Sequence, residues 1–288
     1  MEEIAENVFI EEGYPRVVLW VLKLQQGLLL VDSPFRLEDV PSWQSKLSQL
    51  GAGMERLLVL LDAHVDRTMT IRAMETNVLA HENVIEIIRG RSTSSKNQDL
   101  EPGPDWTHTD FPIGYRCVKP QLTFTDKALL HWDENPILVT HKPGAHSAGV
   151  WLIDETRKIA FIGDSVLEAQ PPFFAQADIE TWISELNWLQ SDRFENFKLI
   201  SSRNGVIDFN SVNKMAAFLT KTKELLNDLA SEDSPLEGIP ELVSHLLKKL
   251  DYDHQSHERY INRLIWGLEQ YYLRNLADQE LETKGEEE

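Results

Sequence analysis

The fold is decided by the stretch Asp62-Ala63-His64-Val65-Asp66-Arg67, which directly follows the apolar run Arg56–Leu61. That run is nearly all Leu and Val, as expected of a strand that is buried on both faces. Three side chains that can bind a metal ion alternate after it, in a turn that leads into a predicted helix at Thr68–Thr76. The pattern predicts a polar cluster at the carboxyl edge of the strand, either a metal site or a set of helix-capping and turn residues.

Three later segments place further polar residues beside predicted strands. Gly144-Ala145-His146-Ser147-Ala148-Gly149 precedes the apolar Val150–Ile153, and the apolar Ile159-Ala160-Phe161-Ile162 ends in Gly163-Asp164. Ser201-Ser202-Arg203-Asn204-Gly205 follows another predicted strand. In this order the segments resemble the signatures of the metallo-β-lactamase superfamily. That family binds two metal ions through four successive signatures: the motif His-x-His-x-Asp-His, then a single histidine, an aspartate and a last histidine. The resemblance runs from about residue 7 to about residue 210.

The resemblance implies an α+β fold, the four-layer αββα sandwich of the metallo-β-lactamase type. We assign residues 1–210 to this domain. Residues 211–279 are expected to form a helical C-terminal region that packs on the core or on a partner, because their apolar residues recur at helical spacing. The acidic segment 280–288 is too polar to bury, so we expect it to be disordered.

Local patterns predict the elements of such a fold. Alternating or continuous apolar runs predict strands at 17–24, 28–31, 56–61, 121–125, 128–132, 137–140, 150–153, 159–162 and 198–201. Apolar residues at helical spacing, with Pro and Gly at the ends of some runs, predict further helices at 41–50, 178–190, 212–229, 239–250 and 258–276.

By resemblance, the first metal ion would keep a chemically acceptable set of two imidazoles and two carboxylates. Its ligands would be Asp62, His64, His146 and Asp164. The added carboxylate shifts the preference from zinc towards manganese or iron. If all four groups bound a tetrahedral zinc ion, no position would remain for water, so activity would require five-coordination or a disengaged Asp164.

The second metal ion is expected to be absent. Its site would retain Asp66, but Arg67 and Asn204 stand where the family has histidines. Arg67 is always protonated and has no lone pair for a metal ion. Its guanidinium would instead bring a positive charge close to Asp66 and Asp164, in place of the second cation.

The function that the resemblance implies is hydrolysis of a small ester, thioester, amide or phosphate-containing substrate with at most one metal ion. Asp66 or Asp164 would accept the proton of a bound water, and Arg67 and Asn204 would bind the substrate. The alternative is a metal-free, catalytically inactive binding or regulatory protein on the same scaffold. A third hypothesis is an assembly subunit, with a homodimer formed through the C-terminal helices. The fold alone does not decide among them.

Composition limits the partners. The chain of 288 residues has a formal net charge of −19, so its overall field repels phosphodiester backbones and anionic lipids. We therefore expect a small-molecule ligand or substrate, with neither nucleic acid nor membrane as a partner. The acidic start Met1-Glu2-Glu3 has no basic segment before an apolar stretch, which favours a cytoplasmic location. Cys117 is the only cysteine, which excludes an intramolecular disulfide.

Overall fold

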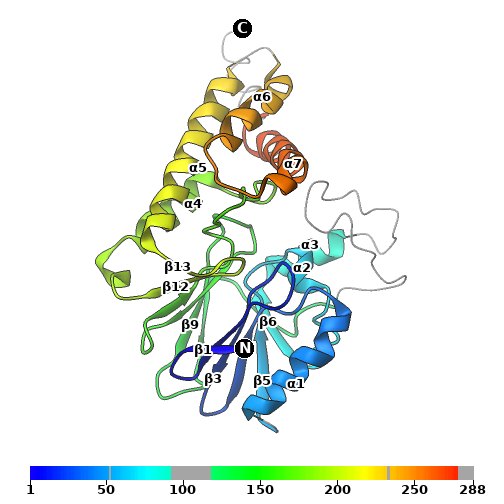
Figure 1. Ribbon diagram of the computed structural model, residues 1–288, viewed down its shortest axis with the longest axis vertical. Helices are drawn as coiled ribbons and strands as arrows, with labels where there is room; N and C mark the ends of the chain where they lie inside the picture. The colour runs from blue at the N-terminus through cyan, green and yellow to red at the C-terminus, as the bar shows by residue number, and fades with distance from the viewer. Residues whose placement is uncertain (52, 92–117, 232–233, 278–288) are drawn as a thin grey trace.

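Two β-sheets lie face to face in the computed structural model, which describes residues 1–51, 53–91, 118–231 and 234–277 (Figure 1). The first sheet has seven strands in chain order, of which β1 to β4 are antiparallel and β4 to β7 are parallel. Its strands are β1 (Glu2–Ala5), β2 (Val8–Glu11), β3 (Leu19–Lys23), β4 (Gly27–Val31), β5 (Glu55–Val59), β6 (Asn77–His81) and β7 (Leu122–Phe124).

The second sheet has six strands in the order β13-β12-β11-β10-β9-β8. Only β11 and β12 are parallel to each other, and the other neighbours are antiparallel. Its strands are β8 (Lys127–Leu130), β9 (Ile137–His141), β10 (Val150–Asp154), β11 (Ile159–Phe161), β12 (Lys198–Ser201) and β13 (Gly205–Ile207). Both sheets therefore contain parallel strands whose carboxyl ends can carry a site.

Three apolar clusters define the four layers of the sandwich. The inner faces of the two sheets meet in a cluster that includes Trp20 and Phe161. The outer face of the first sheet is covered by α1 (Val40–Gly51) and α3 (Asn83–Gly90). The outer face of the second sheet packs against α4 (Ile179–Leu189) and the C-terminal helices. This arrangement confirms the predicted αββα sandwich.

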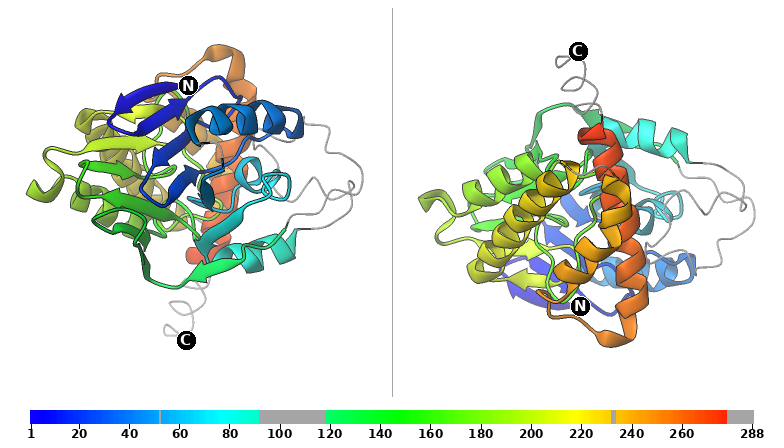
Figure 2. Two further views of the ribbon diagram at one scale, coloured as in Figure 1. Left: turned by 90° about the horizontal axis from the view of Figure 1, so that it is seen from below. Right: turned by 90° about the horizontal axis from the view of Figure 1, so that it is seen from above.

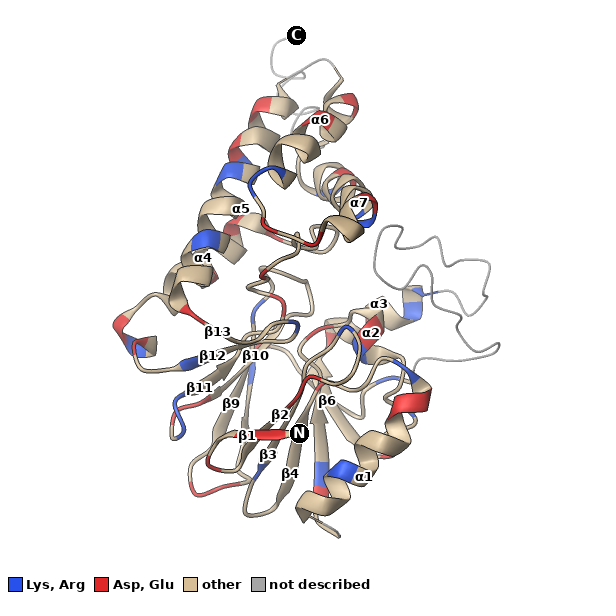
Figure 3. Ribbon diagram, viewed as in Figure 1, with Lys and Arg blue, Asp and Glu red and all other residues tan. Residues whose placement is uncertain are grey.

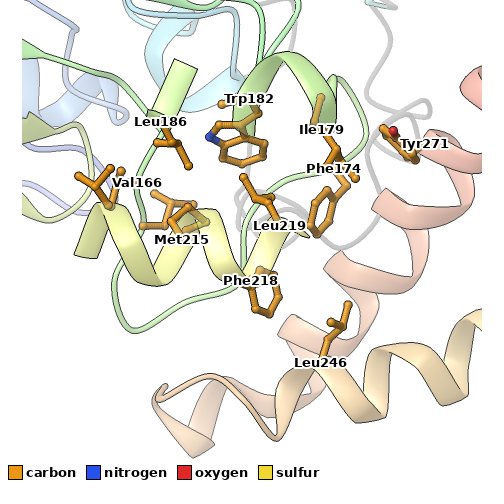
Figure 4. Close-up of a cluster of buried hydrophobic side chains, with 14 of the residues drawn as sticks. Val166, Phe174, Ile179, Trp182, Leu186, Met215, Phe218, Leu219, Leu246 and Tyr271 are labelled. Atoms are coloured by element: carbon orange, nitrogen blue, oxygen red, sulfur yellow. The ribbon is translucent and has the colours of Figure 1, made fainter. Parts of the chain in front are cut away.

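The C-terminal region is helical, as predicted. Its helices α5 (Phe209–Ala230), α6 (Pro235–Leu247) and α7 (His257–Asn275) gather at one end of the sandwich (Figure 2). Side chains of α4, α5, α6 and α7 share one buried cluster (Figure 4). The apolar stripe of α7, which includes Leu264 and Leu268, is buried within this chain. Homodimerisation through these helices stays a prediction. No helix in the described ranges is both long enough and apolar enough to cross a membrane.

One local prediction is wrong, and two features of the sequence lie outside the described residues. The helix expected at 68–76 is wrong: α2 spans only Val65–Thr68, and residues 69–76 form bends and turns. The last of these, Glu75 and Thr76, lead directly into β6, and Glu75 has a positive φ of 52°, which a helix cannot contain. Cys117 and the acidic segment 280–288 lie outside the described residues.

Helix α4 holds the loop that carries His146 through a close contact at Gly144. A Cβ atom at Gly144 would lie 2.4 Å from the Cα atom of Trp182, so only glycine fits there. The backbone N–H of Gly144 donates to Oε2 of Glu185 at 3.1 Å. Burial raises the pKa of Glu185 to about 8, although the nearby Lys142 ammonium and this hydrogen bond oppose the rise.

This raised pKa predicts a stability that depends on pH. The folded chain keeps a proton on Glu185 that the unfolded chain releases, so the free energy of unfolding should fall as pH rises from about 4.5 to about 8. The upper limit of the slope is about 1.4 kcal/mol per pH unit. A Glu185→Gln variant, which keeps an acceptor but cannot ionise, should lack this contribution. Its stability relative to the wild type should therefore be higher at pH 8 than at pH 5.

Urea unfolding at several pH values checks this prediction. Glu180→Gln, a substitution at an exposed position of the same helix, is the control and should show little pH-dependent difference. A Glu185→Gln difference that is the same at pH 5 and pH 8 would contradict the assignment.

Candidate functional site

The polar cluster lies where the parallel strands of both sheets end. Asp32 follows β4 and Asp62 lies just beyond β5, at the carboxyl ends of two neighbouring parallel strands. Asp164 and Arg203 follow β11 and β12, the parallel pair of the other sheet. The central strands are mostly uncharged along their length (Figure 3), so these charges gather at one edge of the sandwich. All four side chains are buried.

Arg67 is the most deeply buried cation of the cluster, with 0% exposure. It lies in α2, next to Asp66, and its backbone carbonyl accepts a hydrogen bond of 2.8 Å from Ser33 Oγ. Its Nη1 donates to Asp62 Oδ2, and its Nη2 donates to Asp164 Oδ1. Its Nε lies 3.2 Å from Asp32 Oδ2. One guanidinium therefore contacts carboxylates from both sheets.

Arg203 forms a second bridge on the other side of Asp164. Its Nε donates to Asp164 Oδ2 at 2.9 Å, and its Nη1 donates to Asp66 Oδ2 at 2.6 Å. The guanidinium also lies over the ring of Phe173, 4.8 Å from the centroid. Arg263 of α7 also lies over this ring, 4.1 Å from the centroid. The C-terminal helices thus reach the edge of the cluster.

Asp164 is the group that the two guanidinium ions share. The order of charges is Asp62, Arg67, Asp164, Arg203 and Asp66, with opposite charges alternating. Burial alone would raise the pKa of Asp164, but the neighbouring Arg203 and Arg67 outweigh burial and hold this pKa well below its usual range. Asp164 is therefore ionised at neutral pH, and its two oxygens accept from different arginines.

Asp32 anchors the far side of Arg67. Its Oδ1 accepts from the N–H of Leu61 at 3.0 Å, and its Oδ2 accepts from Ser202 Oγ at 3.1 Å. Burial raises the pKa of Asp32, while the charge of Arg67 works against the rise. Asp32 thus ties three strand ends together, because Leu61 follows β5 and Ser202 follows β12.

Two histidines complete the cluster. The Nδ1 atom of His64 lies 3.0 Å from Asp62 Oδ2 and 3.5 Å from Asp164 Oδ2. The ring of His146 meets that of His64 edge to face, with centroids 4.7 Å apart. The N–H of Ala148 donates to Nδ1 of His146 at 3.0 Å. Burial lowers the pKa of His146 well below its usual value, and nearby positive groups add to this effect, so this ring is neutral.

The loop that carries His146 is fixed by contacts with α3 and β9. The backbone carbonyl of Ser147 accepts from Asn83 Nδ2 at 2.7 Å and contacts His141 Nε2 at 3.1 Å. His141 of β9 stacks on His81 of β6, with ring centroids 3.5 Å apart and an angle of 11° between the planes. The two imidazoles therefore join the sheets beside the site, which is a structural role.

The structure brings together six of the seven residues that the sequence singled out. Asp62, His64, Asp66, Arg67, His146 and Asp164 all lie in or beside the cluster. The expected pairing of Arg67 with Asp164 is present, whereas Asp66 pairs with Arg203.

Asn204 bonds to Glu168 rather than to the charged groups of the cluster, and its role in binding a substrate stays a prediction. Its side chain accepts from the N–H of Glu168 and donates to the carbonyl of Glu168, both at 3.0 Å. The turn after β12 instead directs Arg203 into the cluster.

Sequence reasoning missed two members of the cluster, Asp32 and Arg203. A signal for Asp32 was present, because it directly follows an apolar strand, as Asp62 does after the run Arg56–Leu61. Arg203 directly precedes Asn204, the residue that the sequence analysis assigned to the site, in a polar stretch with no periodicity. Its direction depends on the turn between β12 and β13, which sequence spacing does not specify.

A metal ion fits this site poorly. Among the described residues, one group has the spacing of metal ligands: Asp62, His64 and Asp164, whose ligand atoms lie within 4.8 Å of one another. His146 is not part of this group. The facing oxygens of Asp62 and Asp164 already accept from Arg67 or Arg203. A metal ion there would have to approach buried guanidinium ions or displace them, at a cost set by charges in a low dielectric.

The ion pairs of Arg67 predict a large effect on stability. Replacing Arg67 with Ala leaves three buried carboxylates without this partner, which should cost about 3–5 kcal/mol in the free energy of unfolding or prevent folding. Urea unfolding measures the difference. Arg89→Ala is the matched control, because Arg89 pairs with Glu86 on the surface and should cost about 1 kcal/mol at most. Equal losses in the two variants would show that the buried network is unimportant for stability.

Comparison with known proteins agrees with this architecture. No family model matches the chain. The sequence is 24% identical over 174 residues to proteins named acyl-coenzyme A thioesterase MBLAC2 from Homo sapiens and Bos taurus, covering 56% of this chain and 61% of each relative. The matched segment thus spans less than two thirds of these relatives.

Solved structures resemble the chain more completely. The metallo-β-lactamase family protein TTHA1429 from Thermus thermophilus matches with a TM-score of 0.64 at 16% identity, covering 93% of each chain. A β-lactamase domain protein from Burkholderia ambifaria matches with a TM-score of 0.67 at 12% identity, covering 95% of this chain and 89% of that one. The DIM-1 metallo-β-lactamase matches with a TM-score of 0.59 at 17% identity, covering 76% and 96%. The chain therefore has the fold of the metallo-β-lactamase superfamily, with a cluster of aspartates, histidines and arginines at the strand ends.

Proposed function

We propose that this protein is a metal-independent, non-hydrolytic binding or regulatory protein on the metallo-β-lactamase scaffold. The observation that carries the proposal is the position of Arg67. Its guanidinium is fully buried and lies between Asp62 and Asp164, two of the three residues with metal-ligand spacing. A fixed cation thus interacts with the oxygens that a catalytic metal ion would need.

The chemistry of hydrolysis supports the same conclusion. A catalytic metal ion in this superfamily needs an open position at which water binds and loses a proton. The two candidate proton acceptors, Asp66 and Asp164, both accept hydrogen bonds from Arg203. The two guanidinium ions beside Asp164 hold its pKa well below the usual range, which makes this carboxylate a weaker base. We therefore expect Asp164 to be an inefficient general base.

A second candidate function is hydrolysis with one metal ion, favoured by a specific observation. The ligand atoms of Asp62, His64 and Asp164 retain a spacing that suits a cation, and His146 lies beside them. These four residues would hold the ion, zinc or alternatively manganese or iron, if Arg67 moved away. The metal would supply an activated water. The relatives named acyl-coenzyme A thioesterase make a thioester the first substrate to test.

Metal content and thioester hydrolysis separate the two candidates. Protein purified without added metal should contain less than about a tenth of an equivalent of zinc, manganese or iron. After incubation with each metal, it should release no thiol from acyl-coenzyme A substrates above the rate of a His64→Ala variant. The reason is that Arg67 and Arg203 remain on the carboxylates.

The opposite result has a clear form. About one bound metal ion per chain, together with thiol release that His64→Ala abolishes, would establish the one-metal hydrolase and refute our proposal.

A further inference from the structure

Two cation positions flank Asp164, and each is filled by one guanidinium. Oδ1 of Asp164 accepts from Arg67 Nη2, and Oδ2 accepts from Arg203 Nε at 2.9 Å. Each arginine holds a further carboxylate on its outer side, Asp62 for Arg67 and Asp66 for Arg203. Asp164 therefore links two cations, each of which also contacts at least one other carboxylate.

We propose that Arg67 and Arg203 each take the place of one metal ion on either side of Asp164, and that both cation positions can be reopened by removing the guanidinium. This inference rests on the proposed function, and it assigns a separate role to each arginine. It also changes the expectation from the sequence, in which Arg67 replaced the second ion. Arg67 contacts Asp62 and Asp164, which are the carboxylates of the first ion, whereas Arg203 contacts Asp66 and Asp164.

The charge of the cluster explains why the positions would remain attractive to cations. Arg67 pairs with Asp62 and Asp164, and Arg203 pairs with Asp66 and Asp164. Removing either guanidinium leaves these buried carboxylates without that partner. Unpaired buried carboxylates are unfavourable unless they gain a cation or a proton. An imidazole in place of the guanidinium is neutral when it binds a metal ion, and it adds a ligand.

The two positions should differ in affinity. The position of Arg67 is bordered by Asp62, His64 and Asp164, three donors whose ligand atoms lie within 4.8 Å of one another. The position of Arg203 is bordered by two carboxylates, Asp66 and Asp164, and by the ring of Phe173, which offers no ligand. We therefore expect the first position to bind a divalent ion more tightly after the arginine is replaced.

The test uses four single variants and one double variant of the full chain with Co²⁺ as the probe. Arg67→His and Arg203→His should each bind about one Co²⁺ ion, and the double variant about two, with visible absorption bands from the bound ion. Arg67→Lys and Arg203→Lys are the matched controls, because a lysine keeps the positive charge and should bind none. Elemental analysis gives the stoichiometry, and the wild type should match the lysine variants.

Folding is measured separately from metal binding. Circular dichroism establishes whether each variant is folded without metal. A variant that has lost its ion pairs but can bind Co²⁺ should melt at a higher temperature when Co²⁺ is added, because the ion binds only the folded state. A His variant that is unfolded alone but folds with Co²⁺ also supports the inference.

Three results would overturn the inference, and they separate it from the proposed function. Folded His variants that bind no more Co²⁺ than the wild type would overturn it while leaving the metal-independent function intact. Lysine variants that bind as much as the histidine variants would show that charge does not close the positions. One Co²⁺ ion bound by the wild type on His64 would overturn both the role of Arg67 and the proposed function.

Discussion

The ionised carboxylate of Asp164, held between Arg67 and Arg203, is the interaction on which the site depends. It connects the turn after β5 in one sheet to the turns after β11 and β12 in the other. Buried charges are tolerated only when they are paired and hydrogen-bonded. Asp164 meets this condition through two different guanidinium ions, and each of them requires a further carboxylate. The other carboxylates of the network meet this requirement. Asp32 and Asp62 pair with Arg67, and Asp66 pairs with Arg203.

The scaffold provides the place for this network. Parallel strands in both sheets end at the same edge, so residues that are distant in the sequence meet there. The inner sheet faces pack around Trp20 and Phe161, and the outer faces are covered by helices. The loop that carries His146 is held by the close contact of Gly144 with α4, and by the contacts of Ser147 with Asn83 of α3 and His141 of β9. A rigid frame of this kind keeps a charged cluster in place.

The fold could be predicted largely from residues 62–67, 144–151, 159–164 and 201–205. Each segment joins a strongly apolar strand to a polar turn, and both features have short-range signals. The helix expected at 68–76 was wrong because apolar and polar residues there lie in turns set by tertiary contacts. Thr70 Oγ1, for example, donates to the backbone carbonyl of Pro34, and Arg91 Nη1 donates to Thr68 Oγ1 at 2.8 Å. Such long-range hydrogen bonds cannot be predicted from the helix propensity of the residues at 68–76.

The cluster was harder to predict than the fold. Ligand positions carried over from the family located Asp62, His64, His146 and Asp164, because their spacing from the strands is retained. The partner of each arginine could not be predicted in this way. A guanidinium reaches far from its backbone, so Arg67 passes Asp66, its neighbour in the sequence, and pairs with Asp32, Asp62 and Asp164. Whether Arg203 or Asn204 points into the cluster depends on the conformation of the turn between β12 and β13, which the sequence pattern does not specify.

Crystals of this chain grown with excess zinc would show most directly whether Arg67 or a metal ion lies between Asp62 and Asp164, through an anomalous difference map at the zinc absorption edge. We expect planar guanidinium density of Arg67 between Asp62 and Asp164, with no anomalous peak within coordination distance of His64. An anomalous peak on Asp62, His64 and Asp164, with the side chain of Arg67 turned away, would contradict this expectation.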